Sequence, residues 1–190
     1  MAEPGLKARK VNRRVEQTRA RVLAVARELL PVVGPLGLTY SVLAQQAQVT
    51  RQTLYRHWPQ RDSLLMDLVL TGSSEGSGDA GADPGSVAGE FLRDLWRSME
   101  KEGTGSALMT LAAQAAQDHY SAQVLERVVE ERRAALNVLL EPFAVTVSAE
   151  EFALLLGPVL FQLFLSRQAL ADRVVDLAVS RWLDGVARRA

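Results

Sequence analysis

The chain has 190 residues, 48% of them hydrophobic, with 22 acidic and 22 basic residues. It contains no cysteine, which excludes disulfides, thiolate nucleophiles and thiolate metal ligands. Its two histidines, His57 and His119, argue against a histidine metal site or a conventional histidine-based triad. We therefore expect no metal and no cofactor.

The balanced charge conceals an asymmetry along the chain. Residues 1–70 carry 11 Lys and Arg against 5 Asp and Glu, a net charge of +6, whereas residues 71–190 carry 11 against 17, a net charge of −6. A basic first part is typical of a protein that neutralises nucleic-acid phosphates. The alternative is that the charges of residues 1–14 form only a solvated arm, and such an arm can also touch a DNA backbone or minor groove.

Helical periodicity dominates the chain and no segment alternates as a strand would, so we predict an all-α fold. After a disordered basic arm over 1–14, apolar residues recur at helical spacing over 16–33, and the Gly-Pro-Leu-Gly stretch at 34–37 ends that helix. A second helix is expected after Thr39 or Ser41. A third follows Thr50 and ends at Pro59, and a fourth runs from Arg61 or Asp62 to about Thr71.

The second and third of these helices have the pattern of a helix-turn-helix. In the third, Leu54 and Trp58 repeat at i and i+4 and form an inner face. The outer face carries Arg51, Gln52, Thr53, Tyr55, Arg56 and His57. Such side chains can donate to phosphates and to base edges in a major groove. The motif therefore predicts a DNA-binding protein.

A Gly- and Ser-rich segment separates this part from the rest of the chain. Residues 72–86 contain no apolar side chain larger than alanine, so we expect a flexible loop. Helices are then predicted over 87–102, 106–118, 122–140, from a capping box at Ser148 and Glu151 to about 170, and over 172–188. The apolar helix that ends near 170 is interrupted by Gly157-Pro158, which predicts a kink and leaves no run long enough for a membrane span.

The N-terminal motif resembles the DNA-binding domain of the tetracycline-repressor (TetR) family. The resemblance rests on Leu43-Ala44, on residues 47–50 (AQVT), on residues 53–58 (TLYRHW) and on residues 61–64 (RDSL). Gln48 stands where that pattern has Gly, at a turn position that favours positive φ, and Gln52 stands where Gly or Pro is common. Residues 154–163, 171–175 and 177–185 resemble TetR-type ligand-binding domains more loosely.

The resemblance implies a homodimer that regulates transcription, most often as a repressor released from a palindromic operator by a small molecule. A cytoplasmic location is expected on other grounds, since no apolar run reaches membrane-spanning length and the basic N-terminus lacks the apolar region of a signal peptide. It divides the chain into a helix-turn-helix domain over 15–60 and a ligand-binding and dimerisation domain over 61–190. Tyr55 and His57 are expected on phosphates, and Arg61 near the DNA backbone. The full set of expected DNA-binding residues is Thr39, Thr50, Arg51, Gln52, Thr53, Tyr55, Arg56, His57 and Arg61.

Apolar side chains of the second part supply two further predicted sites. A small-molecule pocket is predicted from Trp96, Met99, Met109, Phe161, Gln162 and Phe164, although each could be ordinary core. A dimer interface is predicted from Leu163, Val175, Val179, Trp182 and Leu183, because the last two helices are apolar on more than one face.

Two other functions remain open. The protein could be a DNA-organising dimer that responds to no ligand, or a small helical enzyme with an incidental helix-turn-helix. Against an enzyme, the sequence shows no paired carboxylates, no nucleotide-binding loop and no set of nucleophile and base.

Overall fold

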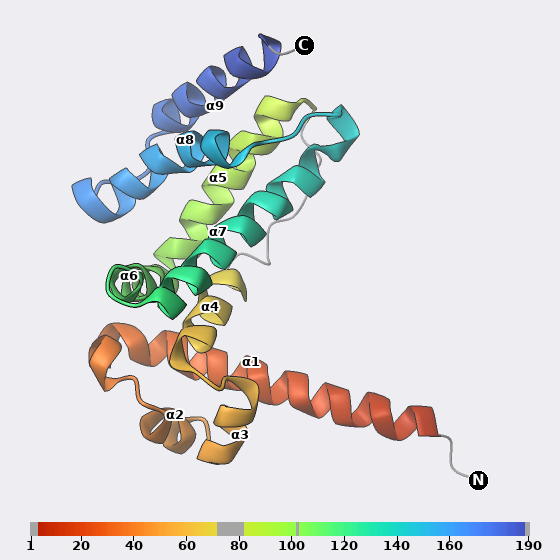
Figure 1. Cartoon of the computed structure of the whole chain (residues 1–190), viewed down its shortest axis with the longest axis vertical. Coiled ribbons are helices and arrows are strands. Elements are labelled where there is room, and N and C mark those ends of the chain that lie inside the picture. Colours follow the sequence, from red (N-terminus) through yellow and green to blue (C-terminus); the bar gives the residue numbers. More distant parts are fainter. Residues whose placement is uncertain (1–3, 72–81, 102, 189–190) are drawn as a thin grey trace. The chain divides into compact units, whose positions relative to one another are not determined.

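The computed structural model describes residues 4–71, 82–101 and 103–188, with side chains from residue 13 onward. Every regular element in these ranges is a helix, which confirms the all-α prediction (Figure 1). In chain order the helices are α1 (Pro4–Gly37), α2 (Tyr40–Gln46), α3 (Arg51–His57), α4 (Arg61–Thr71), α5 (Pro84–Glu100), α6 (Thr104–Ala115), α7 (His119–Leu140), η1 (Glu141–Phe143), α8 (Ala149–Leu160), η2 (Phe161–Ser166) and α9 (Asp172–Ala187).

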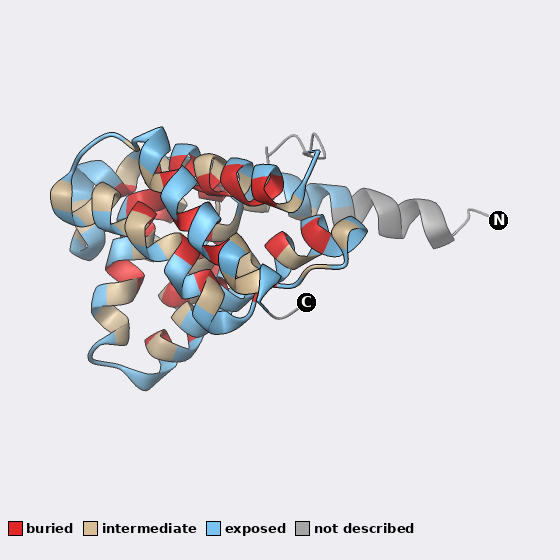
Figure 2. Ribbon diagram, turned by 90° about the horizontal axis from the view of Figure 1, so that it is seen from above, coloured by how far each residue is buried: buried red, intermediate tan, exposed pale blue. Residues whose placement is uncertain are grey.

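The chain forms two compact units. Unit 1 comprises Met1–Val69 and Glu102–Val124, and unit 2 comprises Leu70–Lys101 and Leu125–Ala190. Buried and exposed residues alternate around the longer helices, as expected for amphipathic helices around a core (Figure 2). The sequence-based division after residue 60 therefore differs from the compact units, because α6 and the start of α7 pack with the helix-turn-helix.

Helix α1 begins earlier than the sequence analysis expected. Residues 4–14 are helical, so the predicted disordered arm is wrong for this stretch, and residues 1–3 lie outside the described residues. The reason is that 6–30 contains neither Gly nor Pro and is rich in Ala, Arg, Leu and Glu, which favour helix. The predicted break is present, since Gly34 adopts a φ of 67° between Pro31 and Pro35.

The helix-turn-helix forms around the predicted caps. Thr39 accepts a hydrogen bond from the amide of Val42, and Thr50 accepts one from the amide of Thr53. In the turn, Gln48 has a φ of 51°, the left-handed conformation that the sequence analysis associated with this position. The core of unit 1 includes the fully buried side chains of Leu30, Leu38, Leu43, Leu54, Trp58, Leu64, Leu65, Leu68 and Leu111.

Helix α6 joins unit 1 through a close approach to α1. Gly103, the residue before α6, has a φ of 83°. A Cβ at this position would lie 2.5 Å from the carbonyl oxygen of Arg27. Only a glycine lets the two backbones approach this closely without a clash. This contact explains why α6 packs with the N-terminal helices.

Helix α5 of unit 2 starts inside the segment that was expected to be a loop. Residues 72–81 lie outside the described residues, but 84–86 are helical because Pro84 occupies the first turn of α5 and Asp83 caps it. The Asp83 carboxylate accepts from the amides of Gly85 and Ser86, at 2.8 and 3.0 Å. These bonds satisfy two amides that would otherwise lack partners at the start of the helix.

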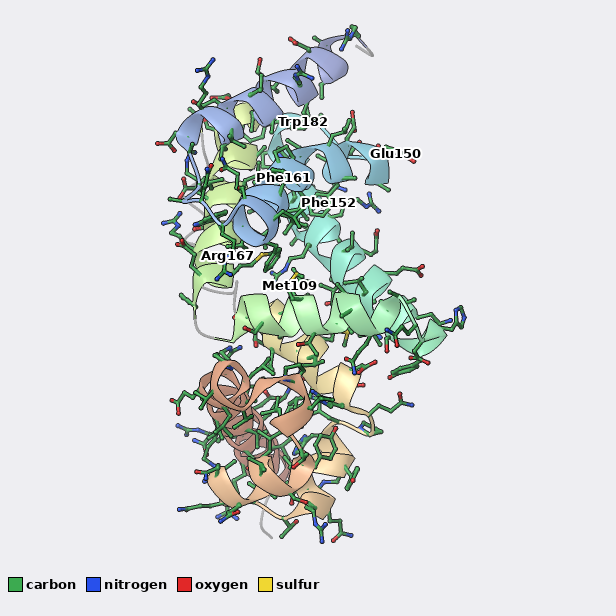
Figure 3. All side chains as sticks on the ribbon, turned by 90° about the vertical axis from the view of Figure 1, so that its left-hand side faces the viewer. Met109, Glu150, Phe152, Phe161, Arg167 and Trp182 are labelled. Carbon is green, nitrogen blue, oxygen red and sulfur yellow. The ribbon has the colours of Figure 1, made fainter. Side chains whose placement is uncertain are left out.

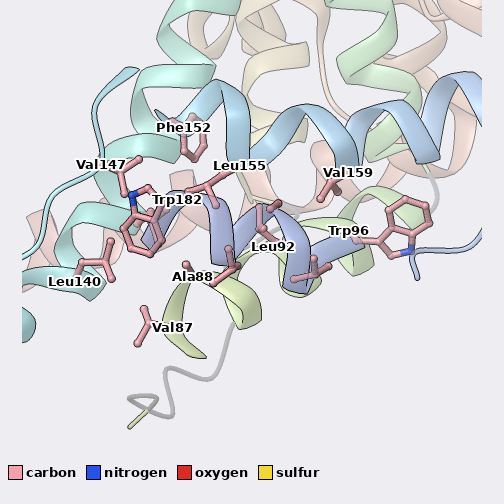
Figure 4. Close-up of a cluster of buried hydrophobic side chains, with 14 residues drawn as sticks. Val87, Ala88, Leu92, Trp96, Leu140, Val147, Phe152, Leu155, Val159 and Trp182 are labelled. Carbon is pink, nitrogen blue, oxygen red and sulfur yellow. The ribbon is translucent and has the colours of Figure 1, made fainter. Parts of the chain in front are cut away.

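Helices α5, α7, α8 and α9 enclose the core of unit 2. Figure 4 shows its buried side chains, among them Ala88, Leu92, Trp96, Leu140, Val147, Phe152, Leu155, Val159 and Trp182. In the segment that joins η1 to α8, the amide of Val147 donates to the side-chain oxygen of Asn137 at 2.7 Å. This hydrogen bond anchors the segment to α7. The capping box predicted at Ser148 and Glu151 is present in full.

Helix α8 is shorter than predicted. It passes through Pro158 and continues as the π-helical segment η2, which ends at Ser166 because Arg167 has a φ of 54°. The 18-residue segment Ala149–Ser166 has a mean hydropathy of 1.4, and 22% of it is buried. By length and composition alone it could cross a membrane, which the sequence analysis did not expect. A large apolar surface is therefore exposed along α8 and η2.

Candidate nucleic-acid interface

Helix α3 presents one buried and one exposed side. Leu54 and Trp58 are buried, with 0% and 1% of their surface exposed. Arg51, Gln52, Tyr55 and Arg56 are exposed, and Thr53 and His57 are half-buried. The structure thus brings six of the nine predicted DNA-binding residues onto one short helix, as the spacing predicted.

The capping residues lie beside this helix but have structural partners. The Thr50 and Thr53 hydroxyls lie 2.9 Å apart in a hydrogen bond, while the Thr53 amide donates to the Thr50 hydroxyl at 3.1 Å. Thr39 likewise caps α2. These three hydroxyls therefore already form hydrogen bonds that hold the two helices of the motif in place. Any contact of theirs with a phosphate would be additional to this structural role.

A residue that the sequence analysis did not select, Tyr40, supports the exposed Tyr55. Their rings meet edge to face with centroids 4.8 Å apart, and the Tyr40 hydroxyl donates to the Trp58 carbonyl at 2.6 Å. Burial, with a smaller effect from Tyr55, raises the pKa of Tyr40 to about 12. The Tyr40 hydroxyl therefore keeps its proton at neutral pH and remains a donor.

Arg61 is drawn toward α1. Its guanidinium donates to the carbonyl of Pro35, and burial lowers the pKa of the group. This hydrogen bond ties the start of α4 to the last turn of α1. The predicted contact of Arg61 with a DNA backbone would have to use the part of the guanidinium that Pro35 leaves free.

Behind α3, the carboxylate of Asp67 joins three helices of unit 1. The indole nitrogen of Trp58 donates to Asp67 Oδ2 at 2.6 Å, and Arg19 lies 2.7 Å from the same oxygen. Sequence analysis missed this site. The sequence did contain a signal for it, since Asp67 stands among apolar residues of α4. A carboxylate buried in that position requires a hydrogen-bonding or charged partner.

A second polar cluster in unit 1 links the start of α4 to the start of α7. The Ser121 hydroxyl lies within hydrogen-bonding distance of Asp62 and, at 2.8 Å, of Asp118, and it can donate to one of them at a time. Nearby, the hydroxyl oxygens of Ser63 and Tyr120 lie 3.2 Å apart in a hydrogen bond. Hydrogen bonds from the Ser121 amide and hydroxyl lower the pKa of Asp118.

The residues predicted for a ligand pocket differ in their burial and belong to both compact units. Trp96 belongs to the core of unit 2 and Met99 is buried, whereas Met109 lies on α6 in unit 1 with 45% of its surface exposed. Phe164 is half-buried. Phe161 and Gln162 do line a cavity, which is the groove described next. Among the described residues, no cluster of His, Asp and Glu could hold a metal ion.

A groove of about 710 Å³ runs between α8 and α9. Its walls are mostly apolar, and Phe161 and Trp182, both labelled in Figure 3, contribute to it from the two helices. The groove is flanked by apolar side chains that are more than half exposed, namely Leu154 (73%), Phe161 (58%) and Leu177 (56%). Such a concentration of exposed apolar groups is unusual on a surface that faces only water.

The structure corrects part of the predicted dimer interface. Val175, Val179 and Trp182 are buried within the protomer, and Leu163 and Leu183 are half-buried against the same core. Helix α9 is apolar on several sides, so the sequence did not reveal which side packs inward. The side facing α5 and α8 carries the predicted residues. The exposed side carries Leu177 instead.

The described residues thus define an all-α protein with an N-terminal helix-turn-helix, the arrangement of DNA-binding transcriptional regulators. Residues 22–68 match the family model described as bacterial regulatory proteins, tetR family. No curated protein sequence matches the chain. This match covers the helix-turn-helix and supports the resemblance of the motif to the TetR family.

Solved structures share the fold over most of the chain. The TetR family transcription regulator SCO0332 has a TM-score of 0.66 at 25% identity, covering 89% of this chain and 98% of that one. A transcriptional regulator from Rhodococcus sp. Rha1 has a TM-score of 0.59 at 19% identity, covering 88% and 96%. The multidrug binding protein EbrR, complexed with imidazole, has a TM-score of 0.58 at 19% identity, covering 86% and 93%.

Proposed function

We propose that this protein is a cytoplasmic repressor that binds a palindromic DNA operator as a homodimer and releases it when a small molecule binds. The observation that carries the proposal is α3, whose inner side is buried while Arg51, Gln52, Tyr55 and Arg56 are exposed together. Donors on a short, rigid helix are what base edges and phosphates require. The net charge of +6 on residues 1–70 supplies non-specific attraction to DNA.

The exposed apolar groove between α8 and α9 supports the dimer. A second copy of the chain related by twofold symmetry would cover Leu154, Phe161 and Leu177 with their own equivalents. Two helix-turn-helix motifs could then occupy adjacent major grooves about 34 Å apart. This separation explains why a palindromic operator is expected.

A structural neighbour supports the ligand response, because EbrR, a multidrug binding protein, has this fold. Helix α4 is placed to transmit a change, because Asp67 ties it to Trp58 and the Leu70 carbonyl accepts from Arg132 of α7 at 3.0 Å. A ligand releases DNA only if it binds the non-binding conformation more tightly.

Selection of duplexes from a random DNA pool tests the proposal. Purified protein at a stated salt concentration should enrich a palindrome with half-sites about one helical turn apart. Uniform, salt-sensitive binding without an enriched motif would contradict it and favour the DNA-organising alternative. No DNA binding at all would contradict both and redirect attention to an enzymatic role.

A further inference from the structure

Two side chains of α3 lie opposite its buried side. With 3.6 residues per turn, successive positions are rotated by about 100°, so Gln52 and Arg56 each lie about 160° from Leu54. Leu54 is completely buried, and both other side chains are exposed. Because they are four residues apart, Gln52 and Arg56 share one edge of the helix. This edge is the part of unit 1 that would reach deepest into a groove occupied by α3.

The other polar side chains of α3 either contact a neighbouring residue or lie away from this edge of the helix. The Thr53 hydroxyl is bonded to Thr50, and the Tyr55 ring packs against Tyr40. Arg51 lies about 60° from Leu54, toward the side on which Trp58 packs. Within the part of the chain that the structure describes, Gln52 and Arg56 form no hydrogen bond and no ion pair, so their donors and acceptors are available.

We propose that Gln52 and Arg56 are the specificity-determining pair of the DNA site, with Gln52 reading an adenine and Arg56 a guanine. This inference rests on the proposed function. The Gln amide has a donor and an acceptor that match N7 and N6 of adenine. The Arg guanidinium presents two parallel donors to O6 and N7 of guanine.

The helix geometry also limits the distance between the two bases. Four residues of α-helix rise about 6 Å, whereas stacked base pairs rise about 3.4 Å. The adenine and the guanine therefore lie within about two base pairs of each other in each half-site. Arg51, on the flank of the helix, contacts a phosphate and carries no base preference.

The test compares the affinities of single variants for a selected duplex and for each of its single base-pair substitutions. Gln52→Ala should abolish the preference at one A·T pair, about 5- to 140-fold, and keep the preference for the neighbouring G·C pair. Arg56→Ala should abolish the preference at the G·C pair and keep the preference at the A·T pair. Arg51→Ala is the matched control, which should weaken binding to every duplex alike and reduce the salt dependence by about one phosphate contact.

A change of preference gives a sharper test than a loss. Gln52→Glu carries only acceptors, so its preferred base should change from adenine to cytosine, whose N4 amino group donates. If Gln52→Ala and Arg56→Ala weaken all duplexes equally, or if Gln52→Glu keeps the adenine, the assignment is wrong. Failure of the wild-type protein to select any motif would instead contradict the proposed function itself.

Discussion

The indole nitrogen of Trp58 donates to the carboxylate of Asp67 at 2.6 Å, so the end of α3 is fixed to the middle of α4. Trp58 and Asp67 are both buried, with 1% and 8% of their surface exposed, and Arg19 of α1 contacts the same carboxylate. A hydrogen bond between buried groups with one charged partner is strong, and it is costly to break. The orientation of α3 therefore depends on a residue outside the helix-turn-helix.

Replacing this carboxylate should destabilise the protein. We expect Asp67→Ala to lower the free energy of unfolding by about 2–3 kcal/mol, because the Trp58 donor loses its charged acceptor. Urea denaturation measures the change. Arg19→Ala is the control and should cost less than about 1 kcal/mol, since the Arg19 side chain is 40% exposed. Equal losses in the two variants would show that the ion pair, and not the indole, carries the stability.

The contact of α6 with α1 can be tested at Gly103. Gly103→Ala should lower the free energy of unfolding by at least about 2 kcal/mol, because its φ of 83° disfavours a side chain and the Cβ would meet backbone atoms of Arg27. Gly185→Ala is the control, since the nearest heavy atom to its added Cβ, Oε1 of Glu151, lies at an ordinary contact distance of 3.9 Å from this position in α9. That variant should be more stable by up to about 1 kcal/mol. Denaturation curves in which Gly103→Ala matches the wild type would contradict the close approach.

The exposed side of α8 and α9 predicts the oligomeric state. Leu177→Arg should raise the dissociation constant of the dimer by at least about tenfold, since it places a charge in an apolar interface. Sedimentation equilibrium measures the constant. Leu36→Arg, at a side chain that is 90% exposed in unit 1, is the control and should leave the dimer intact. A monomeric wild type, or a dimer unaffected by Leu177→Arg, would contradict the proposed interface.

Asp118, the residue directly before α7, predicts a dependence of stability on pH, because its carboxylate accepts a hydrogen bond from the Ser121 amide in the first turn. Hydrogen bonds from Ser121 hold the pKa of Asp118 below its ordinary value of 3.8. A carboxyl group whose pKa is lowered by folding stabilises the folded state at any pH above the pKa of the unfolded state. This contribution is lost as the pH falls through the pKa of the folded state. Asp118→Ala should therefore lower the melting temperature at pH 7. The difference from the wild type should narrow below pH 3.8, and a constant difference would contradict this origin.

Sequence analysis predicted the local structure of the helix-turn-helix well. Thr39, Thr50 and Ser148 cap helices as their spacing indicated, since a cap depends on residues three positions apart. The left-handed Gln48 was also foreseen at the turn, because the family pattern has glycine there. The early start of α1 was missed because a dense run of basic residues was taken as disordered, although those residues favour helix.

The remaining differences concern packing between distant segments. Asp67 and Trp58 are nine residues apart and Asp62 and Ser121 are 59 apart, so no local pattern reveals their hydrogen bonds. Val175 and Val179 were assigned to an interface because α9 is apolar on several sides, and only the structure distinguishes its inner side. The positions of Gln52 and Arg56 on the outer side of α3 required no long-range information, because they follow from the buried Leu54.

If α3 reads a DNA sequence, the protein should bind one duplex far more tightly than other DNA. Fluorescence anisotropy at about 0.15 M salt would give the affinities of the wild-type protein for its selected duplex and for a scrambled duplex of the same composition. We expect the affinity for the selected duplex to be at least about 10³-fold higher. Equal affinities for the two duplexes would mean that the protein binds DNA through charge alone and that α3 reads no sequence.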